Sequence, residues 1–103
     1  MYEQNIKNLC DTLAKLLYNN AMELELLPAP PRSGKPNPEM YCIFGRSLYI
    51  DGLIEFYSEF HLYPGALEPD GFKILKEAIL ATTPIKRIVP NGNKTGFLLL
   101  KEV

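Results

Sequence analysis

The last third of the chain, residues 70–101, predicts a helix followed directly by a β-hairpin. In its first part, residues 70–81, apolar side chains recur at the spacing of one helical face, and the helix must end before Pro84. Two short apolar runs, 85–89 and 97–101, have the length and composition of strands, and a polar, basic segment with an Asn-Gly pair separates them. Any fold for this chain must therefore accommodate a helix joined to a two-stranded hairpin.

Residues 2–20 predict an amphipathic helix. Its apolar stripe is formed by Ile6, Leu9, Leu13, Leu16 and Leu17. The chain has 103 residues, which is the size of one domain with one modest core. We therefore expect residues 1–103 to form a single domain in which this stripe packs against the core.

The middle of the chain is rich in β-forming residues but fits more than one structure. Residues 22–26 alternate apolar and polar side chains, as a half-buried strand does, although the same residue types also suit the end of a helix. Residues 40–50 predict either a hairpin or one bent strand. Residues 52–62 fit a helix capped by Asp51 and also fit one face of a strand; the cap and the length favour the helix.

Residues 28–38 form a segment that neither a helix nor a central strand accommodates. Five of its residues are prolines, which lack the backbone N–H that both structures use. We expect an exposed, mobile loop at this point of the chain.

Taken in order, these elements predict a small α+β domain with three helices and a C-terminal β-hairpin. The order is helix, β-run, helix, helix, strand and strand, with residues 21–38 as an insertion. This order resembles that of a winged-helix domain, in which a helix leads into a two-stranded wing. The resemblance concerns the order of elements alone, and it implies a fold rather than a function.

The sequence contains no catalytic, cofactor or metal-binding signature. His61 is the single histidine, and one histidine without further ligands at suitable spacing does not indicate a metal site. Cys10 and Cys42 lack a pairing motif, and we expect both to be reduced packing residues. No apolar run approaches the roughly 18–20 residues that span a bilayer, and residues 1–20 are amphipathic rather than a secretory signal. We therefore expect a cytoplasmic, non-enzymatic protein that needs no cofactor.

Charge is unevenly distributed along the chain, although the net charge is only −1. Residues 51–71 carry five carboxylates and no lysine or arginine, whereas residues 72–101 carry six cations and a single carboxylate. From this asymmetry we predict a module that binds DNA or RNA. The phosphate contacts would come from the helix and the hairpin, through Lys73, Lys76, Lys86, Arg87 and Lys94.

The alternative hypothesis is a protein-interaction module: a regulatory or inhibitory subunit that docks on a larger protein, or a homodimer. The hairpin, the acidic segment or the proline-rich loop could each supply the docking surface, and six tyrosines and five phenylalanines offer anchors where they are exposed. The two hypotheses require different surfaces. Phosphate binding needs the cations on one uninterrupted face, whereas partner binding needs an exposed apolar patch.

Overall fold

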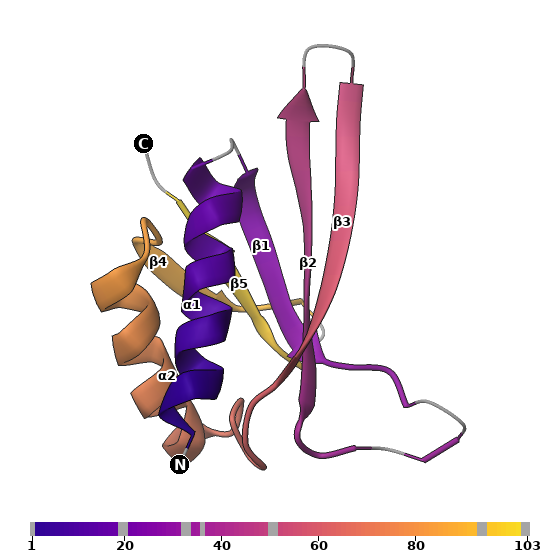
Figure 1. Ribbon diagram of the computed structural model, residues 1–103, viewed down its shortest axis with the longest axis vertical. Coiled ribbons are helices and arrows are strands. Elements are labelled where there is room, and N and C mark those ends of the chain that lie inside the picture. Colours follow the sequence, from indigo (N-terminus) through magenta and orange to yellow (C-terminus); the bar gives the residue numbers. More distant parts are fainter. Residues whose placement is uncertain are drawn as a thin grey trace.

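The computed structural model describes residues 2–18, 21–31, 34–35, 37–49, 52–92 and 95–101. In these residues two helices and five strands follow one another along the chain (Figure 1). The elements are α1 (Glu3–Tyr18), β1 (Ala21–Pro28), β2 (Met40–Tyr49), β3 (Gly52–His61), α2 (Pro69–Thr82), β4 (Arg87–Pro90) and β5 (Phe97–Leu100).

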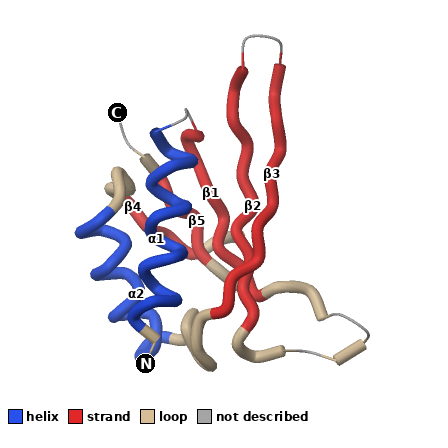
Figure 2. The backbone as a smooth tube through the Cα atoms, viewed as in Figure 1, coloured by secondary structure: helices blue, strands red, loops and turns tan. Residues whose placement is uncertain are grey.

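The five strands form one antiparallel sheet in the order β3-β2-β1-β5-β4. β1 is the central strand, with β2 on one side and the C-terminal hairpin of β4 and β5 on the other. Both helices lie on the same face of the sheet (Figures 1 and 2). The domain therefore has two layers, and its core lies between the helices and this one face.

The core confirms the two clearest periodicities of the N-terminal part of the chain. In α1, Leu9, Leu13 and Leu17 are fully buried, and Leu16 packs at the margin of the core. In β1 the period is two instead: Leu24 is fully buried, the next residue is half-buried, and Leu26 is fully buried again. The expected strand at 22–26 is thus confirmed, and it extends from Ala21 to Pro28.

The C-terminal unit joins the core through α2 and β5. Leu75 and Ile79 of α2 and Leu99 of β5 are fully buried. Phe72 of α2 stacks on Phe97 of β5 with ring centroids 3.9 Å apart, which fixes the start of the helix over the start of the strand. The expected order of a helix followed by a two-stranded hairpin is confirmed for this part of the chain.

Two glycines stand where the backbone of another segment comes too close for a side chain. A Cβ at Gly96 would overlap the carbonyl oxygen of Leu26 in β1, and a Cβ at Gly71 would overlap the carbonyl oxygen of Gly65. The first contact lets β5 begin against the middle of the sheet. The second lets α2 begin directly over the turn that follows β3.

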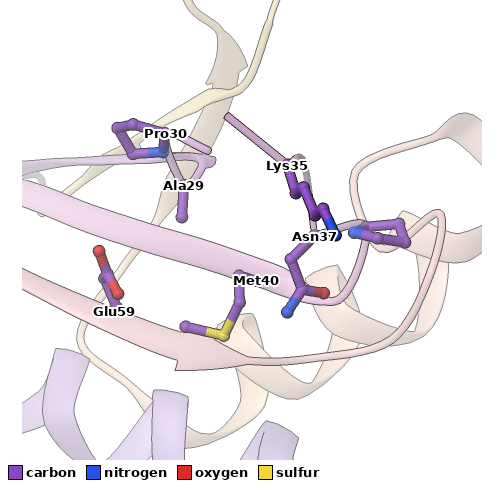
Figure 3. Close-up of a pocket in the computed structure, with 7 residues that line it drawn as sticks. Ala29, Pro30, Lys35, Asn37, Met40 and Glu59 are labelled. Carbon is purple, nitrogen blue, oxygen red and sulfur yellow. The ribbon is translucent and has the colours of Figure 1, made fainter. Parts of the chain in front are cut away.

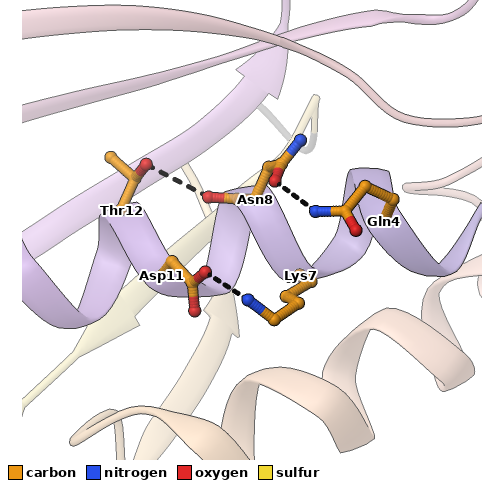
Figure 4. A network of polar contacts seen from close by, with 5 residues as sticks. All are labelled: Gln4, Lys7, Asn8, Asp11 and Thr12. Carbon is orange, nitrogen blue, oxygen red and sulfur yellow. Dashed lines mark hydrogen bonds and ion pairs between the residues drawn. The ribbon is translucent and has the colours of Figure 1, made fainter.

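The outer side of α1 is polar and solvated (Figure 4). The Gln4 amide donates to the Asn8 side chain at 2.8 Å, and the Thr12 hydroxyl donates to the Asn8 carbonyl oxygen at 3.1 Å. Lys7 pairs with Asp11 at 3.0 Å, and both side chains are more than half exposed. Such pairs contribute about 0.3–0.5 kcal/mol at most, so α1 is held in place by its apolar side.

The expected helix over residues 52–62 is wrong, because this segment is strand β3. It pairs with β2 residue by residue from Tyr49 and Gly52 to Met40 and His61. This pairing supplies a partner for the backbone of β3, and it outweighs the local cap and length that favoured a helix. Residues 40–50, which fitted a hairpin or a bent strand, contribute the single strand β2 to this pairing.

The expectation of three helices in a winged-helix-like order is therefore wrong as well. The described chain is of the α+β class, with two helices and a five-stranded antiparallel sheet. The C-terminal hairpin does not project as a wing, because β5 pairs along β1 and the hairpin forms one side of the sheet.

A first prediction follows from the full burial of Leu13. Leu13→Ala should lower the free energy of unfolding by about 2–5 kcal/mol, because it leaves a cavity under α1. Ile74→Ala in α2 is the control, since Ile74 is 64% exposed, and it should change the stability by no more than about 0.5 kcal/mol. Chemical denaturation of the two variants measures the difference, and equal midpoints would contradict the docked position of α1.

Candidate functional site

Four of the five predicted phosphate-binding cations belong to the described residues, and they lie in two places. Lys73 and Lys76 are exposed on α2. Lys86 is exposed just before β4, and Arg87 is the exposed first residue of that strand. Lys94 lies outside the described residues.

These cations do not share one face of the molecule. Ile88 of β4 packs against the core, which lies on the helix side of the sheet. Because side chains alternate along a strand, Arg87 lies on the opposite side of the sheet from α2. The structure therefore brings Lys73 and Lys76 together on one helix and separates them from Arg87.

Other charges interrupt the basic segment. Asp70 and Glu77 are exposed on α2 together with Lys73 and Lys76. The Lys101 ammonium donates to the carbonyl oxygen of Leu17 at 3.0 Å, near the C-terminal end of α1, where a cation complements the helix dipole. The charge asymmetry of the sequence thus does not become a continuous basic face in the described part of the chain.

The second feature of the surface is the face of the sheet that the helices leave uncovered, which we call the open face. Strand pairing and side-chain alternation place its described residues in rows across the strands. Phe44 of β2 lies between Glu25 of β1 and Tyr57 of β3, and Cys42 lies between Leu27 and Glu59. Among the residues whose side chains the structure describes, the open face comprises Glu23, Glu25, Leu27, Met40, Cys42, Phe44, Tyr57, Glu59, His61, Arg87, Val89, Leu98 and Leu100. The strand register also places Arg46 and Glu55 on this face.

β5 is apolar on both of its sides. Phe97 and Leu99 face the helices, whereas Leu98 and Leu100 lie on the open face. A strand with one solvated face normally alternates apolar and polar residues, and an uninterrupted apolar run is typical of a strand covered on both faces. The sequence of β5 thus fits a strand that is covered on both sides, whereas Leu98 and Leu100 are only half-buried on the side that neither helix covers.

Carboxylates surround this apolar centre. Leu98 lies opposite Glu25, and Leu100 lies between Glu23 and Arg87. Glu59 adds a third carboxylate from β3. The open face is therefore an apolar strip with acidic neighbours on β1 and β3.

A small polar cluster lies at the β3 side of the open face. The Tyr57 hydroxyl donates to Glu59 at 3.0 Å, and the side chain of Cys42 is buried beside them. Burial raises the pKa of the Cys42 thiol, the carboxylates of Glu59 and Glu25 raise it further, and a hydrogen bond with Tyr57 offsets part of this. The thiol therefore stays protonated at neutral pH, which is the reverse of what an activated nucleophile requires.

The tip of the C-terminal hairpin is tied to the open face through Asn91, which is 3% exposed. Its side-chain oxygen accepts from the backbone N–H groups of Thr95 at 3.0 Å and Gly96 at 3.2 Å. Its side-chain nitrogen donates to Glu25 of β1 at 3.1 Å. One side chain thus closes the turn and connects β4 to the central strand, and it holds Glu25 in place.

A cleft of about 460 Å³ lies where the proline-rich segment leaves the sheet (Figure 3). Ala29, Pro30, Lys35 and Asn37 line it from that segment, and Met40 and Glu59 line it from β2 and β3. Its lining thus combines one cation, one carboxylate and an apolar floor. The residues of the segment that the structure describes, from Pro30 to Asn37, are exposed.

The described residues contain no group of three or more histidine, cysteine or acidic side chains that could hold a metal ion. Neither helix combines the length and the apolar character needed to cross a bilayer.

The open face was missed by sequence reasoning because residues 52–62 were assigned to a helix. The signal was present in part, since Tyr57, Glu59 and His61 share one side only on a strand. The apolar run of β5 was a second signal, because it predicts cover on both faces.

The chain matches no known protein family, no curated protein and no solved structure at a significant level.

The hydrogen bonds of Asn91 generate a second prediction. Asn91→Ala should destabilise the fold by about 1–3 kcal/mol, because it leaves the buried backbone N–H of Gly96 and the part-buried N–H of Thr95 unpaired. Asn37→Ala is the matched control: Asn37 also accepts a backbone N–H, from Glu39 at 3.0 Å, but in an exposed position, so its loss should cost about 0.5 kcal/mol or less. Thermal or chemical unfolding of both variants checks this, and equal effects would contradict the role of Asn91.

Proposed function

We propose that this protein is a non-enzymatic interaction module that binds a larger protein through the open face of its sheet. The observation that carries the proposal is the double-sided apolar character of β5, with Leu98 and Leu100 on the side that neither helix covers. Burying such side chains releases about 25 cal/mol per Å² of apolar surface. A partner protein that covers the open face would supply this burial.

The charges of the open face indicate the chemistry of that partner. Glu23 is exposed and Glu25 and Glu59 are half-buried, and Arg87 is an exposed cation of this face. The strand register places Arg46 on the same face, between Glu23 and Glu55, so carboxylates outnumber cations there. A complementary surface would present apolar side chains bordered by lysine or arginine. The carboxylates would repel a phosphate bound at the open face, since charges act on one another over roughly 8 Å at physiological salt.

The state of the remaining reactive groups supports a non-enzymatic role. The pKa of Cys42 is raised by burial and by neighbouring carboxylates, so it is not activated. His61 is exposed at the end of β3, and its register partner is Met40 rather than a nucleophile or a carboxylate.

Site-specific photo-crosslinking tests the proposal. A photo-reactive phenylalanine in place of Leu98 should capture a protein from a lysate of cells that produce this chain. The same group in place of Ile74, which is exposed on α2, is the matched control on the other side of the molecule and should not capture that protein. Glu23→Lys should reduce the capture at position 98, because it reverses a charge on the open face.

Two results would contradict this function. One is equal capture from positions 98 and 74, which would show that the open face has no preference for a partner. The other is capture at position 98 that Glu23→Lys leaves unchanged, which would remove the argument from charge.

Nucleic-acid binding is the second candidate, and the exposed pair of Lys73 and Lys76 on α2 favours it. If these two side chains contact phosphates, Lys73→Gln and Lys76→Gln should each lower the slope of log affinity against log salt by about one unit. Arg87→Gln should not, because Arg87 lies on the opposite side of the sheet. Titration with DNA and RNA at two salt concentrations checks this, and an absence of binding at low salt would remove the candidate.

A further inference from the structure

The two edges of the sheet differ in how they are protected against pairing with another chain. β4 forms one edge, and it has only four residues, begins with Arg87 and ends with Pro90. Shortness, charge and proline are the usual means by which natural proteins prevent edge pairing. β3 forms the other edge, and it has ten residues with neither lysine nor proline. Its ladder with β2 shows no shift of register, so no bulge turns this edge away.

The hydrogen-bond pattern shows which backbone groups of β3 face outward. The Leu62 N–H donates to the Glu39 carbonyl oxygen at 2.8 Å, directly after the Met40–His61 pair. In an antiparallel ladder, hydrogen-bonded pairs alternate with non-bonded pairs. The even-numbered residues of β3 therefore bond to β2, whereas the backbone groups of Tyr57, Glu59 and His61 point toward the outer edge of the sheet.

We propose that β3 pairs in antiparallel fashion with β3 of a second copy of this chain, with Ser58 on the two-fold axis. In this register Tyr57 lies opposite Glu59 of the second copy, and Glu59 lies opposite its Tyr57. Each of these pairs exchanges two backbone hydrogen bonds, because both residues direct their N–H and C=O groups outward. The side chains are compatible too, because the Tyr57 hydroxyl, which donates to Glu59 of its own strand at 3.0 Å, could donate to Glu59 of the second copy instead.

Neighbouring registers lack this complementarity. An axis through Glu59 would place two carboxylates opposite each other, which is destabilising for a cross-strand pair. An axis through Tyr57 would place the two phenols opposite each other and leave Glu59 without a phenol across the interface. Of the axes at residues 57, 58 and 59, the one at Ser58 places a phenol opposite a carboxylate on both sides of the axis.

The pairing has a structural consequence for the open face. A two-fold axis perpendicular to the sheet keeps the helices of both copies on the same side, so the two sheets join into one continuous sheet. The two open faces then lie next to each other along it. The pairing does not depend on what binds the open face, because it uses backbone groups of the β3 edge.

Disulfide trapping tests the register. Ser58→Cys should form a disulfide-linked dimer under mild oxidation, because residues in a non-hydrogen-bonded antiparallel pair have Cα atoms about 4.5 Å apart, within disulfide range. Tyr57→Cys is the control in the same strand: residue 57 is 49% exposed, but its copies would lie diagonally, at about 7–8 Å, too far for a disulfide. Cys10 and Cys42 are buried and should not interfere in the folded protein.

A second variant tests the pairing without cysteine chemistry. The N–H of Glu59 faces outward, so Glu59→Pro removes a donor of the interface and none of the bonds to β2. By analytical ultracentrifugation the unmodified chain should sediment as a dimer, and Glu59→Pro should sediment as a monomer with an unchanged circular dichroism spectrum. A monomeric unmodified chain would overturn the proposal, as would trapping of Tyr57→Cys as fast as Ser58→Cys. Either result leaves the photo-crosslinking test of the open face unaffected, so the two proposals can fail separately.

Discussion

The fold depends on the two-sided pairing of β1. This strand hydrogen-bonds to β2 along one edge and to β5 along the other, while Leu24 and Leu26 project into the core beneath the helices. Among the described residues, the N-terminal strands and the C-terminal hairpin have no other direct strand pairing with each other. Because both halves of the chain meet on β1, the close approach of Gly96 to Leu26 and the bond from Asn91 to Glu25 stabilise the whole sheet rather than one turn.

This arrangement also determines which surfaces remain for recognition. Two helices of 16 and 14 residues cover one face of the sheet, and the described chain has no further helix for the other face. The same strands that build the core must therefore present their alternate residues to the outside. On β1 these residues are glutamates at 23 and 25, as solvent exposure requires, but on β5 they are Leu98 and Leu100. On the open face, each glutamate of β1 therefore lies directly opposite a leucine of β5.

The sequence predicted the correct element wherever the spacing of apolar residues fitted either a helix or a strand but not both. The stripe of α1, the alternation of β1 and the helix–hairpin order of the C-terminal unit depend on local patterns alone. The prediction failed at residues 52–62, where local signals fitted both a strand and a helix and favoured the helix, whereas the pairing of β3 with β2 decided for the strand. That error produced the winged-helix-like expectation and hid the open face. The grouping of cations could not be predicted either, because Arg87 and Lys73 are separated by the sheet, which only the tertiary fold reveals.

The two unprotected surfaces of the molecule are adjacent. Tyr57 and Glu59 belong to the β3 edge through their backbone and to the open face through their side chains. β4, at the far edge, combines the three usual means of protection in four residues. The chain thus protects the β4 edge but leaves the β3 edge long and without lysine or proline. The protection of β4 shows that this chain can protect an edge, so the state of β3 calls for an explanation of its own. We therefore interpret the exposed edge and the open face as parts of one recognition surface, on which self-association uses the β3 edge and partner binding centres on β5, with β2 and β1 between them.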